Sequence, residues 1–228
     1  MKISIIMPVF NEIATIEEAV KRVKNSSVNF DKEIIIVDDA STDGTRQLIE
    51  MMEGVGLKKA YHLKNQGKGA AIRTALQQVT GDIVIIQDAD LEYHPDEYPR
   101  LIEPILDNKA DVVYGSRFIG AHRCYLFNHY LGNKLINLIA NTIYNTMLTD
   151  FMTGYKAFWA ESLKDVIIKS NRFGFESEIT GIFFKKGLRI YEVPISYSGR
   201  GYQEGKKITW KDGIKAIFTV LKYNLFRQ

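Results

Sequence analysis

The chain has 228 residues, of which 46% are hydrophobic and 25% are charged, the composition of an ordinary globular protein. Its net charge of +3 is mild, and we expect no nucleic-acid partner. Cys124 is the only cysteine, which excludes a disulfide framework and a cysteine metal site and fits a reducing compartment. No apolar run approaches the ~18 residues of a spanning helix, and the short, interrupted apolar start does not resemble a signal peptide.

The first half of the chain alternates apolar strands with helices. Strands are predicted at 3–7, 33–37, 58–63, 82–87 and 110–114, and helices at 15–24, 42–53, 67–79 and 95–106. Thr15 and Glu18 have the spacing of a capping box at the start of the first helix. Continuous apolar strands that alternate with helices indicate an α/β fold, with a mostly parallel central sheet covered by helices on both faces.

The second half is less regular, but it contains no linker or repeat, and we expect one shared core. Helices are predicted at 128–147, 175–186 and 210–226, and extended segments at 155–159 and 188–195. The first and last of these helices are amphipathic, and their apolar faces can pack in the core or lie in a membrane interface. From residue 181 onward, ten basic residues stand against three acidic ones. This excess suits a phosphate-rich ligand, an anionic membrane surface or a solvated face.

Three carboxylates follow the fourth predicted strand, whose apolar residues lead directly into Asp88, Asp90 and Glu92. Carboxylate oxygens are hard ligands, and a Mg²⁺ or Mn²⁺ ion held by one or two of them keeps places for phosphate oxygens. The segment therefore predicts an enzyme that handles a nucleoside diphosphate. The alternatives are a polar strand end with an ordinary turn, or a helix N-cap at the following Pro95. Glu92 can be a third ligand or can simply face water.

Other polar groups follow the first two strands, at the edge of the sheet where ligands of such folds bind. Phe10 can stack on a base and Glu12 can bind a ribose or base donor, or this segment can be a plain helix entry. An exposed carboxylate at Asp38 or Asp39 can accept hydrogen bonds from a nucleoside. Residues 41–43 are typical helix caps instead.

Basic residues stand at three places that suit a phosphate. Two glycines flank Lys68 ahead of a helix, where close backbone approach and the helix N-terminus favour an anion, although the spacing is neither a Walker loop nor a Rossmann fingerprint. Arg117 follows the fifth strand and can clamp a phosphate with two donors. Arg200 and Lys206 belong to a glycine-containing basic loop that can close over a diphosphate.

In this order, the motifs resemble those of the family 2 glycosyltransferases with the GT-A fold, over nearly the whole chain. The matching segments are PVFNE at 8–12, VDDASTDGT at 37–45, NQGKGAAIRTA at 65–75, QDADLEYHPDE at 87–97, GSRF at 115–118, DFMTGYKAF at 150–158, FGFESE at 173–178, EVPISYSGR at 192–200 and EGKKITWKDG at 204–213. The later motifs resemble the dolichyl- and polyprenyl-phosphate sugar synthases, which move mannose or glucose onto a lipid phosphate. The resemblance implies one GT-A-like domain over 1–228, with a nucleotide-binding half at 1–117 and an acceptor-binding half at 118–228.

The resemblance also implies residue roles. Asp88, Asp90 and Glu92 match metal-binding positions, although Glu92 stands where some mannose-phosphate synthases carry Gln. The residues expected to bind the nucleotide are Pro8, Phe10, Glu12, Asp38, Asp39, Lys68 and Asp88. Arg117 matches the basic residue that receives the acceptor phosphate, and Arg200 and Lys206 match the loop that closes over the donor diphosphate.

We therefore expect an inverting hexosyltransferase with Mg²⁺ or Mn²⁺ as cofactor, a GDP- or UDP-hexose donor and a polyprenyl phosphate acceptor. Asp90, through the cation, and Arg117, through the acceptor, are the expected catalytic residues. An acceptor phosphate with a second pKa near ~6 is mostly dianionic at pH 7 and needs no base. A hydroxyl acceptor, on a saccharide or a protein, requires a base, for which Asp150, Glu176 and Glu178 are the candidates.

A non-catalytic module that keeps the fold and recruits a membrane partner is a further alternative. Because the lipid acceptor lies in a bilayer, we expect a cytoplasmic protein that is peripheral at the cytoplasmic face of the membrane. It would reach the lipid through an apolar helix face or through a membrane partner protein.

Overall fold

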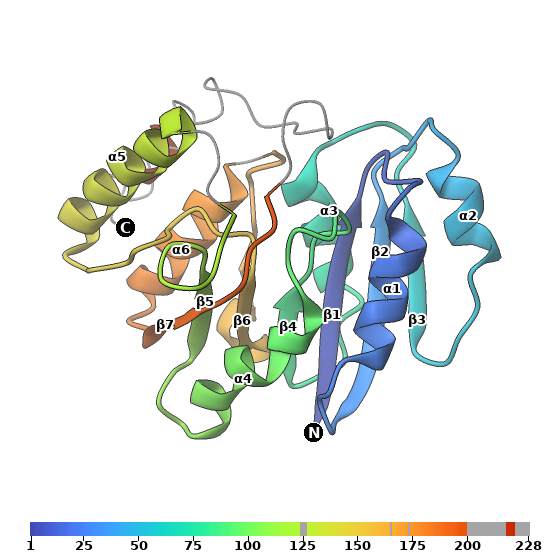
Figure 1. Ribbon diagram of the computed structural model, residues 1–228, viewed down its shortest axis with the longest axis horizontal. Helices are drawn as coiled ribbons and strands as arrows, with labels where there is room; N and C mark the ends of the chain where they lie inside the picture. Colours follow the sequence, from blue (N-terminus) through green and yellow to red (C-terminus); the bar gives the residue numbers. More distant parts are fainter. Residues whose placement is uncertain (124–126, 165, 173, 200–217, 222–228) are drawn as a thin grey trace.

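The structure, a computed structural model, describes residues 1–123, 127–164, 166–172, 174–199 and 218–221 (Figure 1). Within these ranges, seven strands form one sheet in the order β3-β2-β1-β4-β6-β5-β7. They are β1 (Lys2–Val9), β2 (Asp31–Asp38), β3 (Leu57–Tyr61), β4 (Ile83–Ile86), β5 (Val112–Ser116), β6 (Lys156–Trp159) and β7 (Ile190–Pro194). Neighbouring strands are parallel except beside β6, which runs antiparallel to β4 and β5. The predicted mostly parallel α/β fold is confirmed.

Both faces of the sheet are buried, each in its own hydrophobic cluster. Successive residues of a strand point to opposite faces, so one strand contributes to both clusters. In β1, Ile3, Ile5 and Met7 belong to one hydrophobic cluster and Ile6 belongs to the other. Helices α1 (Ile16–Asn25), α2 (Thr45–Met51) and α4 (Tyr98–Leu106) pack on the first cluster, and α3 (Lys68–Leu76), α5 (Phe127–Tyr144) and α6 (Phe175–Lys185) on the second. This double cover explains why the strands read as uninterrupted apolar runs.

Two helix starts differ from the prediction. The Thr15 side chain does not cap α1, and its hydroxyl instead donates to Oε2 of Glu12 at 3.1 Å, so the predicted capping box is wrong. Helix α2 begins at Thr45 rather than at residue 42. The reason is that Asp43 turns the chain, since its Oδ1 accepts a hydrogen bond from the Thr45 backbone N–H at 3.0 Å.

The carboxyl ends of β1, β2, β4 and β5 lie along one edge of the sheet, the upper edge in Figure 1. The loops that leave these ends carry the polar motifs found in the sequence. Because parallel strands end together, segments that are far apart in the chain meet at this edge, where α/β folds bind their ligands.

The structure describes only one of the two predicted amphipathic helices over most of its length. The helix predicted at 210–226 lies outside the described residues, apart from 218–221, which are helical. Helix α5 is described, and it buries Ile136 and Ala140 in the second cluster while leaving other apolar residues exposed. In the part of the chain that the structure describes, we find no helix with the length and apolarity that a bilayer crossing requires.

Candidate active site

The loop after β4 presents Asp88 and Asp90 at the carboxyl edge of the sheet. The buried Gln87 fixes this loop, because its side chain accepts from the Tyr98 hydroxyl and donates to the Asp88 carbonyl, both at 3.0 Å. Oδ1 of Asp90 accepts from the Glu92 backbone N–H at 3.1 Å. The loop thus has a defined geometry, in which both aspartate side chains are partly exposed.

Lys68 forms an ion pair with Asp88. Its Nζ is 2.8 Å from Oδ1 and 2.9 Å from Oδ2 of Asp88, and 3.4 Å from Oε1 of Glu176. Burial alone disfavours the ammonium, but these two carboxylates hold the pKa of Lys68 above its ordinary value. Gly154 lies against the pair, since a Cβ there would stand 2.8 Å from Oδ2 of Asp88 and 2.9 Å from Nζ of Lys68. We refer to Lys68, Asp88 and Glu176 as the carboxylate–lysine cluster.

The donor set at this edge fits a Mg²⁺ or Mn²⁺ ion that brings further ligands with it. Asp88 and Asp90 offer hard oxygens, and Mg²⁺ usually binds through one or two carboxylates plus substrate phosphates. Glu92 differs from the other two, because its Oε2 accepts a hydrogen bond from the Tyr197 hydroxyl at 2.7 Å. Among the described residues, no three acidic, histidine or cysteine side chains gather as a complete metal site. Oxygens of a diphosphate would have to complete the coordination shell.

Asp38 and Asp39 are buried, so the prediction of an exposed carboxylate at this position is wrong. Asp38 pairs with Arg46, whose Nη2 lies 2.8 Å from its Oδ2. Asp39 accepts from the Gly67 backbone N–H at 2.6 Å and lies 2.6 Å from Nδ1 of His62. Buried carboxylates persist where neighbouring donors satisfy them. Here the donors of Asp39 come from the loop that opens α3, so Asp39 fixes the start of that helix.

Pro8, Phe10 and Glu12 lie where the chain leaves β1, and all three are partly exposed. Asn11, at φ +53, ties this loop to the one after β2, because its Oδ1 accepts from the Thr42 backbone N–H at 2.8 Å. The residues predicted to meet the nucleoside therefore stand at the carboxyl edge on two loops that are joined to each other.

Arg117 follows β5 and is held by Asp150 in a two-pronged pair, with Nε–Oδ2 and Nη2–Oδ1 distances of 2.7 Å. Asp150 is fully buried, and its backbone N–H donates to Glu192 at 3.0 Å. Burial opposes the charge, but Asp150 keeps the pKa of Arg117 well above its ordinary value. The guanidinium also lies 5.3 Å from the ring centroid of Tyr197. Arg117 is thus firmly oriented, and a carboxylate already occupies one side of its fork.

Tyr93 connects the carboxylate–lysine cluster with the Arg117–Asp150 pair. Its ring centroid lies 5.5 Å from that of Tyr197, which Arg117 also contacts. Its hydroxyl accepts at 3.2 Å from the backbone N–H of Gly154, the residue that lies against Lys68. Burial raises the pKa of Tyr93 to about 12, so this link stays neutral. The groups after β4 and β5 therefore form one continuous region.

Lys156 is a buried charge to which the motifs assign no role. Its ammonium donates to the Thr153 carbonyl and lies 4.2 Å from the ring centroid of Tyr114. Burial lowers the pKa of Lys156 to about 7, although the nearby Glu176 carboxylate favours the charged form. Lysine is almost never fully buried without a partner, so the signal in the sequence is a single lysine at the start of the otherwise apolar β6.

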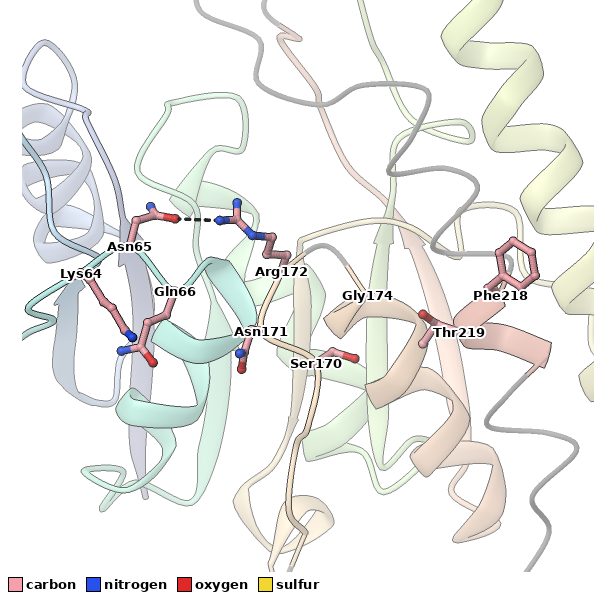
Figure 2. Close-up of a pocket in the computed structure, with 9 residues that line it drawn as sticks. All are labelled: Lys64, Asn65, Gln66, Ser170, Asn171, Arg172, Gly174, Phe218 and Thr219. Carbon is pink, nitrogen blue, oxygen red and sulfur yellow. Dashed lines mark hydrogen bonds between the residues drawn. The ribbon is translucent and has the colours of Figure 1, made fainter.

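An open hollow of about 690 Å³ lies beside the start of α3 (Figure 2). Its walls come from residues 64–66, 170–172, 174 and 218–219. Oδ1 of Asn65 and Nη2 of Arg172 lie 3.4 Å apart and join two of these walls. Gly67, at φ +98, permits the close packing, because a Cβ there would stand 2.5 Å from the Asn171 carbonyl oxygen. The close approach predicted for a phosphate is thus made by the protein's own backbone, and the hollow is lined by none of the predicted site residues.

Arg200 and Lys206, the predicted basic loop over the donor diphosphate, lie outside the described residues. The described chain before them ends at Gly199, two residues after Tyr197. Tyr197 contacts both Glu92 and Arg117, so the chain leaves the described part next to the candidate site.

The chain is similar to known proteins over almost all of its length. A family model described as "Glycosyl transferase family 2" matches residues 4–167. An uncharacterized protein from Methanocaldococcus jannaschii is 30% identical, with 99% of this chain and 93% of that protein aligned. A dolichol-phosphate mannosyltransferase from Pyrococcus furiosus is 28% identical over 98% of this chain, which spans 64% of that enzyme. An undecaprenyl-phosphate mannosyltransferase from Micrococcus luteus is 29% identical, with 90% of this chain and 87% of that enzyme aligned.

Solved structures share the fold. Glucosyl-3-phosphoglycerate synthase from Mycobacterium tuberculosis, in complex with Mn²⁺, UDP and glucosyl-3-phosphoglycerate, gives a TM-score of 0.77 at 22% identity, covering 100% of this chain and 81% of that one. The same enzyme with Mg²⁺ and UDP gives a TM-score of 0.74 at 21% identity, covering 100% and 80%. At such identities the likeness concerns the fold alone, and it confirms the GT-A architecture expected from the motifs.

Proposed function

The chain belongs to glycosyltransferase family 2, and on that basis we propose that it is an inverting enzyme that moves a hexose from a GDP- or UDP-sugar to polyprenyl phosphate, with Mg²⁺ or Mn²⁺. Two relatives are named for the transfer of mannose to dolichol phosphate and to undecaprenyl phosphate. In this proposal residues 1–117 are the nucleotide-binding half and residues 118–228 the acceptor-binding half, with the acceptor residue Arg117 at the boundary between them.

The observation that carries the proposal concerns the three carboxylates that could serve a hydroxyl acceptor as a base. Asp150 and Glu178 are fully buried, and Glu176 is only 4% exposed. Asp150 is held by Arg117, Glu178 accepts two backbone N–H groups at 2.7 and 2.6 Å, and Glu176 lies beside Lys68. A hydroxyl acceptor needs an accessible base, whereas a phosphate monoester is mostly dianionic at pH 7 and attacks without one. The arrangement therefore favours a phosphate acceptor.

The donor side of the reaction is the release of a nucleoside diphosphate from the hexose. Asp88 and Asp90 hold the divalent cation, which supplies positive charge for the leaving diphosphate. Phe10 stacks on the base and Glu12 accepts hydrogen bonds from the nucleoside. In a single displacement, an acceptor phosphate oxygen forms a bond to the anomeric carbon while the bond to the diphosphate oxygen breaks, and the diphosphate leaves with the electron pair.

Arg117 serves the acceptor side of the reaction. Its guanidinium is locked on Asp150 through two hydrogen bonds of 2.7 Å, so it presents its remaining donor surface in a fixed direction. A locked guanidinium positions a phosphate for in-line attack, and positioning of this kind can supply a large part of the rate acceleration. Because a guanidinium does not lose its proton in proteins, Arg117 orients the nucleophile and does not act as a base.

The surface of α5 supports a membrane location. An apolar stripe runs along it at helical spacing, formed by Phe127, Leu131, Leu135 and Leu138, each more than half exposed. Exposed apolar stripes mark interaction surfaces, and a polyprenyl chain lies in a bilayer. In our proposal α5 rests in the membrane interface, and the protein is peripheral at the cytoplasmic face. Contact with a membrane partner protein is the alternative use of the same stripe.

Transfer of radiolabelled hexose by the purified chain tests the proposal. A thermal-shift panel of GDP- and UDP-hexoses with Mn²⁺ first identifies the donor. The donor is then offered with polyprenyl phosphate, 3-phosphoglycerate or a free saccharide. Of the three acceptors, we expect only polyprenyl phosphate to give labelled product. No product should form after EDTA has removed the divalent cation. Product from 3-phosphoglycerate or a saccharide, without product from the lipid, would refute the acceptor assignment. Donor binding without transfer to any acceptor would favour the non-catalytic module.

A further inference from the structure

Glu176 has a buried carboxylate oxygen that nothing satisfies. Its Oε1 lies 3.4 Å from Nζ of Lys68, but its Oε2 has no hydrogen-bond partner within the described part of the chain and is shielded from solvent. Buried polar atoms are nearly always paired, and an ionised oxygen left unpaired is unfavourable. An oxygen of this kind indicates that a donor reaches it in another state of the protein.

Lys68 is the donor best placed to do so. Its Nζ now lies on both oxygens of Asp88, at 2.8 and 2.9 Å, and is already within 3.4 Å of Glu176. A lysine ammonium sits on a flexible four-carbon stem with three rotatable donors. Small rotations of the last torsions of the side chain therefore suffice to move the ammonium from one carboxylate to the other.

A divalent cation gives Lys68 a reason to move. Asp88 is one of the two carboxylates assigned to that cation, and only about a fifth of its side chain is exposed, at 21%. Two cations on one partly buried carboxylate repel each other strongly, because the surroundings screen charge less than water does. The cation and the ammonium therefore exclude each other at Asp88.

We propose that Lys68 is a built-in competitor for the divalent cation at Asp88, and that Glu176 is the positioning residue that receives Lys68 when the cation binds. Without the cation, Lys68 neutralises Asp88 and Oε2 of Glu176 stays unpaired. With the cation on Asp88, the ammonium pairs fully with Glu176. The inference rests on the cation site of the proposed function and adds the two residues that set its affinity. The chain alone then binds the cation weakly, and diphosphate oxygens are needed to shift the balance.

Mn²⁺ binding to the full chain without nucleotide, measured from the electron paramagnetic resonance signal of free Mn²⁺, tests the inference. Lys68→Met should bind Mn²⁺ roughly tenfold more tightly than the wild type, because the competitor is gone. Glu176→Gln should bind it roughly tenfold more weakly, because Lys68 has lost its second carboxylate. The double variant should match Lys68→Met within about twofold, because Glu176 acts through Lys68.

A matched control removes a lysine elsewhere. Lys109 is exposed and pairs with Asp107 at 2.8 Å, ahead of β5 and away from the carboxyl edge. Lys109→Met makes the same change in net charge and should leave Mn²⁺ affinity within about twofold of the wild type. Thermal unfolding of each variant confirms that an altered affinity belongs to a folded protein.

Three results would overturn the inference. They are unchanged or weaker Mn²⁺ binding by Lys68→Met, a loss from Glu176→Gln that persists without Lys68, and the absence of Mn²⁺ binding in every variant. Failure of the proposed cation site itself is a separate result. In that case Asp88→Asn added to Lys68→Met would leave the tighter Mn²⁺ binding intact, which shows that the ion sits elsewhere.

Discussion

Replacement of the buried Lys156 with methionine should change how the free energy of unfolding depends on pH. Burial lowers the pKa of Lys156 from 10.5 to about 7 in the folded protein, and unfolding returns it to the ordinary value. Each pKa unit corresponds to about 1.4 kcal/mol, so the buried ammonium destabilises the folded state by about 5 kcal/mol below pH 7. Above pH 7 the folded amine is neutral while the unfolded one still binds a proton. The stability of the wild type should therefore rise with pH in this window.

The pH dependence separates the charge from other effects of the substitution. The difference in unfolding free energy between Lys156→Met and the wild type should shrink by about 3 kcal/mol from pH 7 to pH 9.5. The methionine also removes the hydrogen bond to the Thr153 carbonyl, which is worth about 1 kcal/mol. Any change in that bond as the amine loses its proton is already contained in the pKa shift, and carboxylates stay ionised throughout the window. The slope therefore reports the buried ammonium alone.

Urea unfolding of both proteins, followed by circular dichroism at pH 7, 8 and 9.5, measures this difference. Lys21→Met is the control, because the Lys21 side chain is 72% exposed. The difference in unfolding free energy between Lys21→Met and the wild type should not change with pH. A difference for Lys156→Met that stays constant within about 0.5 kcal/mol would refute the reasoning. It would mean that the folded amine stays protonated across the whole window, as it does in the unfolded chain.

Three further substitutions test the site and its surroundings. Arg117→Lys keeps the charge but loses the two-pronged pair, so kcat/KM for the acceptor phosphate should fall about 100-fold in steady-state transfer assays, and an unchanged value would contradict the positioning role. Gly154→Ala places a methyl group against the carboxylate–lysine cluster and should weaken the joint binding of Mn²⁺ and nucleotide about tenfold in calorimetry. Gly132→Ala, which has open space around it, should leave this binding unchanged, and equal effects of the two changes would rule out the steric explanation. Leu135→Asn should weaken co-sedimentation with phosphatidylglycerol vesicles severalfold, and the equally polar change Val55→Asn in an exposed loop should leave it unaltered; the reverse order would place the membrane surface elsewhere.

The strands were predictable because burial on both faces leaves a plain trace in the sequence, an uninterrupted apolar run. The same logic placed Asp88 and Arg117 at one edge, since parallel strands end together. What the motifs could not show is which partner each charged group takes. Asp39 looks like a free carboxylate in the sequence, but its acceptor capacity goes to Gly67 and His62, which lie in a loop after another strand.

Pairings across the fold are the part that sequence patterns miss. Lys68 was expected to bind an anionic ligand, yet its anion is the side chain of Asp88, which follows a different strand and comes near only in the folded chain. Glu176 comes from α6, far along the chain, so the sequence cannot show that its Oε2 is buried without a hydrogen-bond partner. The Thr15 capping box is absent for a local reason, because the hydroxyl that would accept from a backbone N–H of the helix instead donates to Glu12.

These pairings bear on where positive charge for the ligands must come from. Lys68 and Arg117 were the basic residues expected to meet phosphate within the described ranges, and each already lies on a carboxylate, Asp88 or Asp150. A nucleoside diphosphate sugar and an acceptor phosphate together bring about four negative charges at pH 7, and one divalent cation offsets two of them. The remaining negative charge has to be balanced by basic groups outside these two ion pairs. The chain from residue 181 carries ten basic residues against three acidic ones. That segment contains Arg200 and Lys206, and a site balanced in this way should bind its ligands more weakly as salt rises.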